Sequence, residues 1–267
     1  MKIKKVSFIG LGVMGYPMAG YLQKSELEVT VFNRTISKAE KWKKEYGGDI
    51  ATTPGDAVKN SDAVFICVGR DEDLREVMDN DNGIFLNTNE EVIIVDHTTS
   101  SANIAREYSA LCNSNKKFFL DAPVSGGQAG AEKGQLSIMV GGNQNAFNTV
   151  KPVLENYGKA IELIGESGSG QLTKMINQIC IAGLVQGLSE AMAFGQNSKL
   201  DMEKVLKVIS KGAAQSWQME NRYRTMLDNK FDYGFAVDWM RKDLSYCFEE
   251  AIKNNSKLPI TEIIDQY

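Results

Sequence analysis

The sequence predicts an α/β fold, a Rossmann-like doubly wound sheet, followed by an all-α domain that is entered through a long interdomain helix. Short apolar runs alternate with helical spacing up to about residue 164, and a glycine-rich turn directly follows the first run. Residues 153–258 then contain no proline, and the alternation typical of strands fades. We therefore place a domain boundary between residues 165 and 166.

Length and composition are those of a globular chain. Of its 267 residues 43% are hydrophobic and 24% are charged, and the net charge is -4. This acidic balance argues against nucleic acid and anionic membranes as partners, since both attract concentrated positive charge. No apolar run reaches the roughly 18 to 20 residues of a membrane span, and the start lacks the apolar run of a secretory signal. We expect a cytoplasmic protein.

Residue usage also limits the chemistry. The four cysteines are far apart and His97 is the single histidine, so we expect no metal site and no Ser-His-Asp triad. A general acid or base would have to be Lys, Tyr, Asp, Glu or His97.

The first strand, around residues 6–9, ends at a GxGxxG turn that leads into helical spacing. The first glycine permits the tight turn, the second lets backbone N–H groups approach a pyrophosphate, and the third lets helix pack on strand. A plain surface turn is the alternative, but the strand before and the helix after favour a dinucleotide site. The predicted cofactor turn consists of Gly10, Leu11, Gly12, Val13, Met14 and Gly15.

The second strand, residues 28–32, ends at Asn33, Arg34 and Thr35. An NAD site usually has a carboxylate here for the ribose 2′-hydroxyl, whereas arginine attracts a 2′-phosphate. We therefore expect NADP as the cofactor, with NAD as the alternative. Arg34 could also be an ordinary solvated charge of a loop.

Further strand-like runs lie at residues 63–68, 92–95, 118–121, 137–140 and 161–164, and helical stretches at 74–78, 102–111 and 146–157. Their alternation predicts a mostly parallel sheet, which binds ligands at the carboxyl ends of its strands. The segments that follow these runs are 68–70, 97–99 and 122–127. We expect His97 to be a structural or cofactor-side residue, since no carboxylate is paired with it in the sequence.

The segment 122–127 contains a proline-fixed turn followed by Ser125, Gly126 and Gly127. Paired glycines can present unhindered backbone N–H groups, and Ser125 adds a hydroxyl. The segment therefore suits a carboxylate, although it could also be a mere connection.

A long amphipathic helix is predicted over residues 168–196, with Lys174 near its start and Asn177 and Gln178 on the same face. Lys174 could donate a proton to a reacting oxygen, or it could be a solvated surface lysine. We expect Ser167 to cap this helix, and Gly168 and Gly170 to keep its first turn open for a ligand.

The rest of the chain is also predicted to be helical. A small-residue stripe, Gly183, Gly187, Ala191 and Gly195, favours core or subunit packing. More helices are predicted near 202–210, 217–227 and 235–253, and one more from about 258.

Four blocks together resemble the β-hydroxyacid dehydrogenase family, which includes 3-hydroxyisobutyrate dehydrogenase, tartronate semialdehyde reductase and glyoxylate/succinic semialdehyde reductase. They are GLGVMGYPMAGYL at 10–22, DAPVSGG at 121–127 with its sequel to 142, GSGQLTKMINQ at 168–178, and KDL at 242–244. The resemblance covers nearly the whole chain. Two departures from the family are the order of Asn177 and Gln178, which blurs the substrate, and the end at Tyr267, from which we expect a shortened helical domain.

The resemblance implies that Lys174 is the catalytic lysine and that Asn177 or Gln178 orients the substrate beside it. It implies that Ser125, Gly126 and Gly127 hold the substrate carboxylate. It also implies cofactor contacts from the glycine turn and from Val68, Gly69, Thr99 and Lys242, and we count Asp73 among the cofactor-binding residues.

These expectations define an NADP-binding Rossmann domain over residues 1–165 and a helical substrate and oligomerisation domain over residues 166–267. We expect an NADPH-dependent reductase of a small carboxylate-bearing semialdehyde or keto acid such as glyoxylate or succinic semialdehyde, with Lys174 as general acid, working as a homodimer or homotetramer. The alternatives are an NAD-dependent 3-hydroxyisobutyrate dehydrogenase and a non-catalytic NADP-binding sensor or scaffold.

Overall fold

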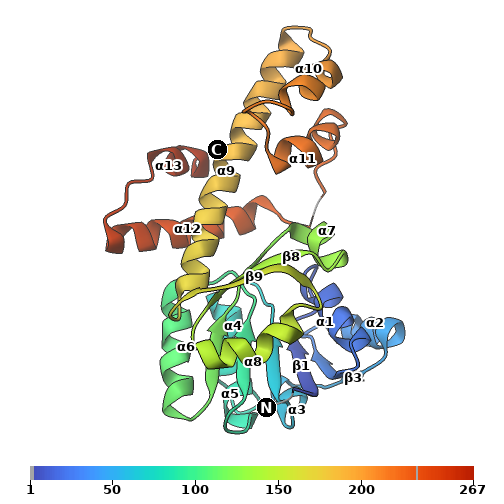
Figure 1. Ribbon diagram of the computed structural model, residues 1–267, viewed down its shortest axis with the longest axis vertical. Helices are drawn as coiled ribbons and strands as arrows, with labels where there is room; N and C mark the ends of the chain where they lie inside the picture. Colours follow the sequence, from blue (N-terminus) through green and yellow to red (C-terminus); the bar gives the residue numbers. More distant parts are fainter. Residues whose placement is uncertain (1–2, 233) are drawn as a thin grey trace. The chain divides into compact units, whose positions relative to one another are not determined.

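The computed structural model describes residues 3–232 and 234–267 and divides into two compact units, Met1–Lys174 and Met175–Tyr267. The first unit contains one mixed sheet with strand order β3-β2-β1-β4-β5-β6-β8-β7, and β9 pairs with β8 (Figure 1). The strands are β1 (Lys5–Ile9), β2 (Glu28–Phe32), β3 (Asp49–Ile50), β4 (Ala63–Ile66), β5 (Ile93–Asp96), β6 (Phe118–Asp121), β7 (Val124–Ser125), β8 (Leu136–Gly141) and β9 (Gly158–Gly165).

Strands β1 to β6 are parallel to one another, whereas β8 runs antiparallel to β6 and β7. In β1, Phe8 and Ile9 point to opposite faces and each belongs to a different apolar cluster. Strands β4 and β5 are buried along their whole length, as expected for central parallel strands covered on both faces.

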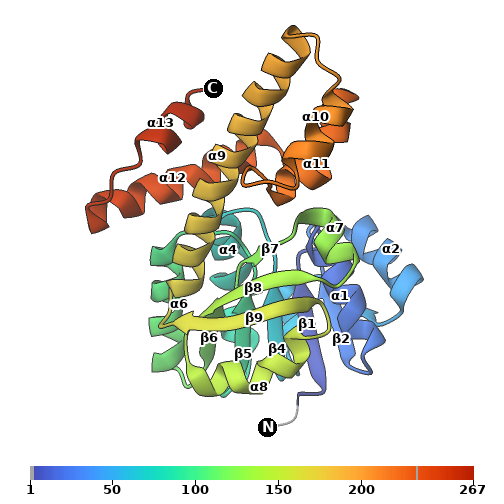
Figure 2. The ribbon, with the colours of Figure 1, turned by 45° about the horizontal axis from the view of Figure 1, so that its top comes forward.

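Helices cover the two faces of the sheet (Figure 2). Residues of α1, α2 and α8 pack into the cluster around Phe8, and residues of α3, α4, α5 and α6 pack into the cluster around Ile9. The helices are α1 (Gly15–Lys24), α2 (Ile36–Tyr46), α3 (Pro54–Val58), α4 (Asp71–Met78), α5 (Ile84–Asn87), α6 (Ala102–Ser114), α7 (Gly127–Glu132) and α8 (Gln144–Leu154).

Local sequence signals explain where several of these helices begin. The hydroxyls of Thr53 and Ser101 and the amide oxygen of Asn143 accept backbone N–H groups at the starts of α3, α6 and α8. Each of these side chains satisfies a donor that a helix leaves unpaired in its first turn.

The second unit is helical in the part of it that the structure describes. Helix α9 (Ser169–Asn197) starts in the first unit and continues through the second, where α10 (Met202–Ile209), α11 (Trp217–Leu227), α12 (Val237–Asn254) and α13 (Pro259–Asp265) follow. A small core joins α9, α10 and α11 through Leu188, Met192, Met202, Leu206 and Met219.

The small-residue stripe of α9 divides into two parts. A Cβ at Gly195 would collide with the sulfur of Met202, so this glycine permits core packing. A Cβ at Gly183 or Gly187 would have no described atom within 4 Å.

The predicted fold class is confirmed: a Rossmann-like α/β sheet is followed by helices. The positions of the longer strands and of the helices agree with the apolar pattern, whereas the two-residue strands β3 and β7 were not predicted from it. The segment 122–127, for which a mere connection was the alternative to a carboxylate site, contains strand β7, because Val124 and Ser125 pair antiparallel with Ile138 and Ser137. In the described ranges, no helix combines the length and the apolar character that a bilayer crossing demands.

Candidate active site

The three glycines of the turn after β1 have different surroundings. Gly10 has φ +98°, and a Cβ there would collide with the carbonyl of Cys67. A Cβ at Gly15 would collide with the carbonyl of Gly10 and lie 3.0 Å from the ring of Phe8. At Gly12 the space within 4 Å is open. The turn therefore needs Gly10 and Gly15 for its own geometry and leaves room at Gly12, just before α1, which suits a pyrophosphate.

Asn33 holds this turn in place. Its Oδ1 accepts the backbone N–H of Leu11 at 2.8 Å, and its Nδ2 donates to the carbonyl of Thr35 at 3.0 Å. The amide side chain thus joins the ends of β1 and β2. A carboxylate could accept from Leu11 but could not donate to Thr35, so the amide has a structural reason to be here.

Arg34 extends from the same loop into solvent, with 76% of its side chain exposed. Its Nη1 lies 3.3 Å from Oε2 of Glu76 and 3.7 Å from Oδ1 of Asp73, both on α4. The predicted cofactor residues Arg34 and Asp73 therefore lie next to each other.

Two further loops, after β4 and β5, are fastened to one another. The backbone N–H of Val68 donates to Oγ1 of Thr98 at 3.1 Å. Asp71, which begins α4, accepts both the N–H and the hydroxyl of Ser101, at 2.8 and 2.6 Å. These bonds bring the segments that carry Val68, Gly69 and Thr99 to the same edge of the sheet.

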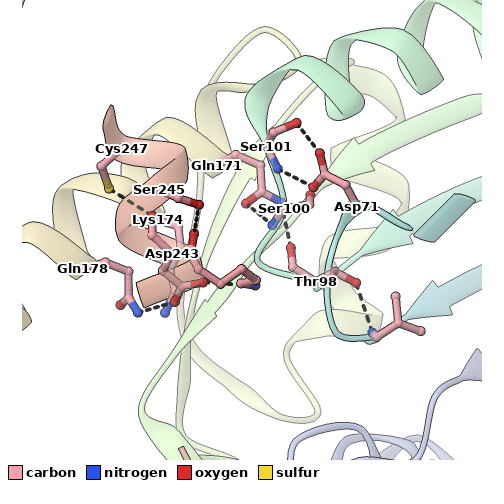
Figure 3. A network of polar contacts seen from close by, with 12 residues as sticks. Asp71, Thr98, Ser100, Ser101, Gln171, Lys174, Gln178, Asp243, Ser245 and Cys247 are labelled. Carbon is pink, nitrogen blue, oxygen red and sulfur yellow. Dashed lines mark hydrogen bonds and ion pairs between the residues drawn. The ribbon is translucent and has the colours of Figure 1, made fainter. Parts of the chain in front are cut away.

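Gln171, in the first turn of α9, binds the loop after β5 from the other side. Its Nε2 donates to the carbonyl of Thr98 at 2.7 Å, and its Oε1 accepts the N–H of Ser100 at 3.2 Å. Figure 3 shows Gln171 against this loop, with Asp71 beside Ser101. Gln171 is fully buried and lies one helical turn before Lys174.

The start of α9 is capped by Asp121 rather than by Ser167. The two carboxylate oxygens of Asp121 accept the N–H groups of Gly168 and Gln171 at 2.8 and 2.9 Å. Burial raises the pKa of Asp121, while these backbone bonds act in the opposite direction. The Ser167 cap was a wrong prediction, because that hydroxyl donates to the carbonyl of Ala105.

We expected Gly170 to leave room for a ligand, but the structure shows that it does not. A Cβ there would lie 2.6 Å from the carbonyl of Asp121 and would collide with the carbonyl of Met139. Gly168 has φ +93°, and a Cβ added there would lie 3.0 Å from Nε of Arg106. Gly170 therefore lets the helix start pack on β6 and β8, whereas Gly168 lies against α6.

His97 is a structural residue. It is buried at the end of β5, with Nδ1 2.6 Å from the carbonyl of Ala122 and Nε2 2.8 Å from the hydroxyl of Tyr157. Because a carbonyl only accepts, Nδ1 carries the proton and Nε2 accepts from Tyr157. Burial lowers the pKa of His97 to about 4, so the ring is neutral at physiological pH.

Lys174 is buried, with 8% of its surface exposed, and its Nζ donates to the carbonyl of Val124 at 2.8 Å. Val124 directly precedes the segment Ser125, Gly126 and Gly127. The two glycines have φ of +134° and +60°, and a Cβ at Gly127 would have no described atom within 4 Å. The predicted acid and the predicted carboxylate loop are therefore brought together within the first unit.

Three of the predicted site residues lie in the second unit: Asn177, Gln178 and Lys242. Asn177 donates to Oε1 of Gln178 at 2.8 Å. Nε2 of Gln178 in turn donates to Oδ2 of the buried Asp243 at 2.6 Å (Figure 3). Lys242 forms an ion pair with Asp243 at 3.0 Å. It also lies 5.5 Å from the ring centre of Trp239.

The roles assigned to these residues stay predictions, and sequence reasoning missed four further residues of the network. Asp121, Gln171 and Asp243 stood inside the quoted motifs, but their partners are 47 to 73 residues away. Asp71 gave only a weak signal, as an acidic residue in a first helical turn. Among the described residues, no cluster of three or more His, Cys, Asp or Glu side chains is arranged to hold a metal ion.

Comparison with known proteins gives matches along the chain. Residues 5–165 match the family model of the NAD binding domain of 6-phosphogluconate dehydrogenase. Residues 168–267 match the NAD-binding model of NADP-dependent 3-hydroxyisobutyrate dehydrogenase.

Individual relatives agree with the family models. An uncharacterized oxidoreductase of Shewanella frigidimarina is 57% identical over 98% of this chain and 90% of its own length. The 2-hydroxy-3-oxopropionate reductase of Escherichia coli is 35% identical over 96% of this chain and 87% of its own length. The structure of Mycobacterium tuberculosis 3-hydroxyisobutyrate dehydrogenase with L-serine has a TM-score of 0.87 and 26% identity, covering 100% of this chain and 92% of that one.

Proposed function

The chain belongs to the β-hydroxyacid dehydrogenase family of NAD(P)-dependent oxidoreductases, and on this premise we propose that it reduces a small carboxylate-bearing semialdehyde or keto acid with NADPH. Lys174 is the general acid in this proposal. The observation that carries it is the buried Nζ of Lys174, held 2.8 Å from the carbonyl of Val124, directly beside the segment Ser125, Gly126 and Gly127.

Substrate orientation follows from the carboxylate loop. The open space at Gly127 allows a carboxylate to approach the backbone N–H groups, and Ser125 adds a hydroxyl donor. A substrate held there by its carboxylate has its carbonyl group displaced by only a few bonds, toward Lys174. Fixing a reactant in this way can contribute up to about 7 to 11 kcal/mol of barrier reduction.

The proton transfer is the step that this chain's own residues perform. A bound reduced nicotinamide supplies the hydride to the carbonyl carbon. Lys174 stabilises the negative charge that develops on the carbonyl oxygen and donates a proton to it, giving the alcohol. In the oxidative direction the neutral amine of Lys174 accepts the hydroxyl proton. Asn177 and Gln178 orient the substrate in this proposal.

NADPH is proposed over NADH because the loop after β2 presents Arg34 and no carboxylate of its own. Val68, Gly69, Asp73, Thr99 and Lys242 are proposed cofactor contacts. The subunits are proposed to form a homodimer or homotetramer, which light scattering on the purified protein measures.

The test of the proposed reaction combines a substrate panel with a lysine variant. Consumption of NADPH and NADH is measured with glyoxylate, succinic semialdehyde, tartronate semialdehyde and methylmalonate semialdehyde. Lys174→Met should lower kcat by about a hundredfold or more while the Kd for NADPH changes by less than about threefold. Lys133→Met removes an equal charge from an exposed position of the same unit and should leave kcat unchanged.

Each alternative has its own outcome. In the oxidation of 3-hydroxyisobutyrate, activity with NAD+ equal to or greater than that with NADP+ would support the NAD-dependent dehydrogenase. NADPH binding without turnover of any panel member would support the sensor or scaffold. A kcat of Lys174→Met close to that of the wild type would eliminate Lys174 as the acid.

A further inference from the structure

Arg34 is shared between two carboxylates of α4. Glu76 and Asp73 lie 3.3 and 3.7 Å from the same atom, Nη1. The side chains of Arg34 and Glu76 are 76% and 60% exposed. Ion pairs this exposed contribute about 0 to 1 kcal/mol to folding. Stability is therefore a weak reason for placing two acidic groups on this arginine.

The position of the three charges relates them to the cofactor turn. Strands β2 and β4 both pair with β1, so the loops that follow them lie on either side of the glycine turn. Arg34 follows β2, and its neighbour Asn33 is bonded to Leu11 of the turn. Helix α4 begins soon after β4. The charge cluster of Arg34, Asp73 and Glu76 therefore lies at the end of the site where the family binds the adenosine ribose.

We propose that Glu76 is a specificity-determining residue, which competes with the cofactor 2′-phosphate for Arg34 and so limits the preference for NADPH over NADH. This inference rests on the proposed use of NADPH. A 2′-phosphate carries about 1.5 to 2 negative charges near neutral pH, so it must displace Glu76 from Arg34 or lie beside it. NADH has a neutral 2′-hydroxyl at this position and meets neither obstacle.

Asp73 and Glu76 are expected to act differently. Asp73 is only 30% exposed and is the farther of the two carboxylates from Arg34. It is a proposed cofactor contact, where a carboxylate can accept from a ribose hydroxyl. Glu76 lies one helical turn further along α4 and contacts Arg34 by a hydrogen bond. Removing the charge of Glu76 should therefore act on the phosphate alone.

The experiment measures the Kd values of NADPH and NADH for the full-length protein by titration calorimetry, with 2′,5′-ADP and AMP as fragments that lack the nicotinamide. Glu76→Gln should tighten NADPH and 2′,5′-ADP about three- to tenfold, as Coulomb's law gives for exposed charges a few ångströms apart. NADH and AMP should change by less than about twofold. The gain should shrink in 0.5 M NaCl, where charges are screened within about 4 Å.

Two matched variants isolate the cause. Glu72→Gln removes the same charge from an exposed position of α4, one turn before Glu76, and should shift the NADPH Kd by less than about twofold. In an Arg34→Gln background, the gain from Glu76→Gln should become smaller, since the competition for Arg34 has gone. A smaller gain in that background is a coupling that a merely structural Glu76 would not produce.

The outcomes separate this inference from the proposed function. Equal NADPH and NADH affinities in the wild type would overturn the proposed cofactor preference. Wild-type preference for NADPH, combined with equal effects of Glu76→Gln and Glu72→Gln or with weaker NADPH binding in Glu76→Gln, would overturn only the role of Glu76.

Discussion

Asp96 and His97 are successive, fully buried residues whose ionisation should affect stability in opposite directions. Burial raises the pKa of Asp96 from 3.8 to about 7, and burial lowers the pKa of His97 from 6.5 to about 4. Between these limits the folded protein keeps the proton on Asp96 that the unfolded chain releases, and it lacks the proton that the unfolded chain binds at His97. Stability therefore falls with rising pH because of Asp96 and rises because of His97.

The two contributions are of similar size, so in the wild type they nearly cancel between about pH 4 and 6.5. Asp96→Asn retains an oxygen for the N–H of Thr98. Of the two residues, only His97 can then change its protonation state. As pH rises from 4 to 6.5, we expect the unfolding free energy of this variant to rise by about 3 kcal/mol more than that of the wild type. His97→Asn leaves Asp96, and we expect a loss of about 4 kcal/mol from pH 4 to 7 on the same basis.

Urea denaturation followed by circular dichroism, at half-unit steps from pH 4 to 7, measures both profiles. Every other titrating group is common to the two variants, so the difference between their profiles isolates Asp96 and His97. Parallel profiles would refute the reasoning, since they would mean that neither group keeps its buried protonation state. Tyr157→Phe offers an internal check, because it removes the donor to Nε2 of His97 and leaves Asp96 as it is.

Two further predictions concern the cofactor loops. Gln171→Met fills the same space but loses both bonds to the loop after β5, and should lower kcat about ten- to a hundredfold through misplacement of that loop. Thr173→Val removes one hydrogen bond from the same helical turn and should leave kcat unchanged. Single-turnover NADPH oxidation compares the two variants, and equal rates would show that Gln171 has no positioning role. Gly12→Ala should weaken NADPH binding without changing Tm, whereas Gly15→Ala should lower Tm by several degrees because its methyl group meets the Gly10 carbonyl. Calorimetry measures both glycine variants, and a stable Gly15→Ala protein would contradict the packing argument.

The parts that could be predicted from the sequence are those that short spacings determine. Gly10, Gly12 and Gly15 lie within one turn, and the apolar runs of β4 and β5 are continuous. Contacts between distant segments gave no such signal. Ser167 looked like the cap of α9 because it lies just before the helix, yet Asp121, 47 residues earlier than Gly168, occupies that role.

Sequence also could not show how the buried polar residues are satisfied. The periodicity of α9 places Gln171 on a buried face, but only the folded chain brings that face to Thr98 and Ser100. The two-residue strand β7 is too short to produce an alternating pattern.

The capping of α9 by Asp121 has a consequence for substrate length. The segment 121–127 has two roles. Its first residue, Asp121, caps the helix that carries Lys174, and its last three residues form the proposed carboxylate loop. With the proposed roles, the amine of Lys174 and the loop that holds the substrate carboxylate are thus both positioned by this one short segment. The separation of the amine and the carboxylate loop would then limit how many carbons can lie between the carboxylate and the carbon that is reduced.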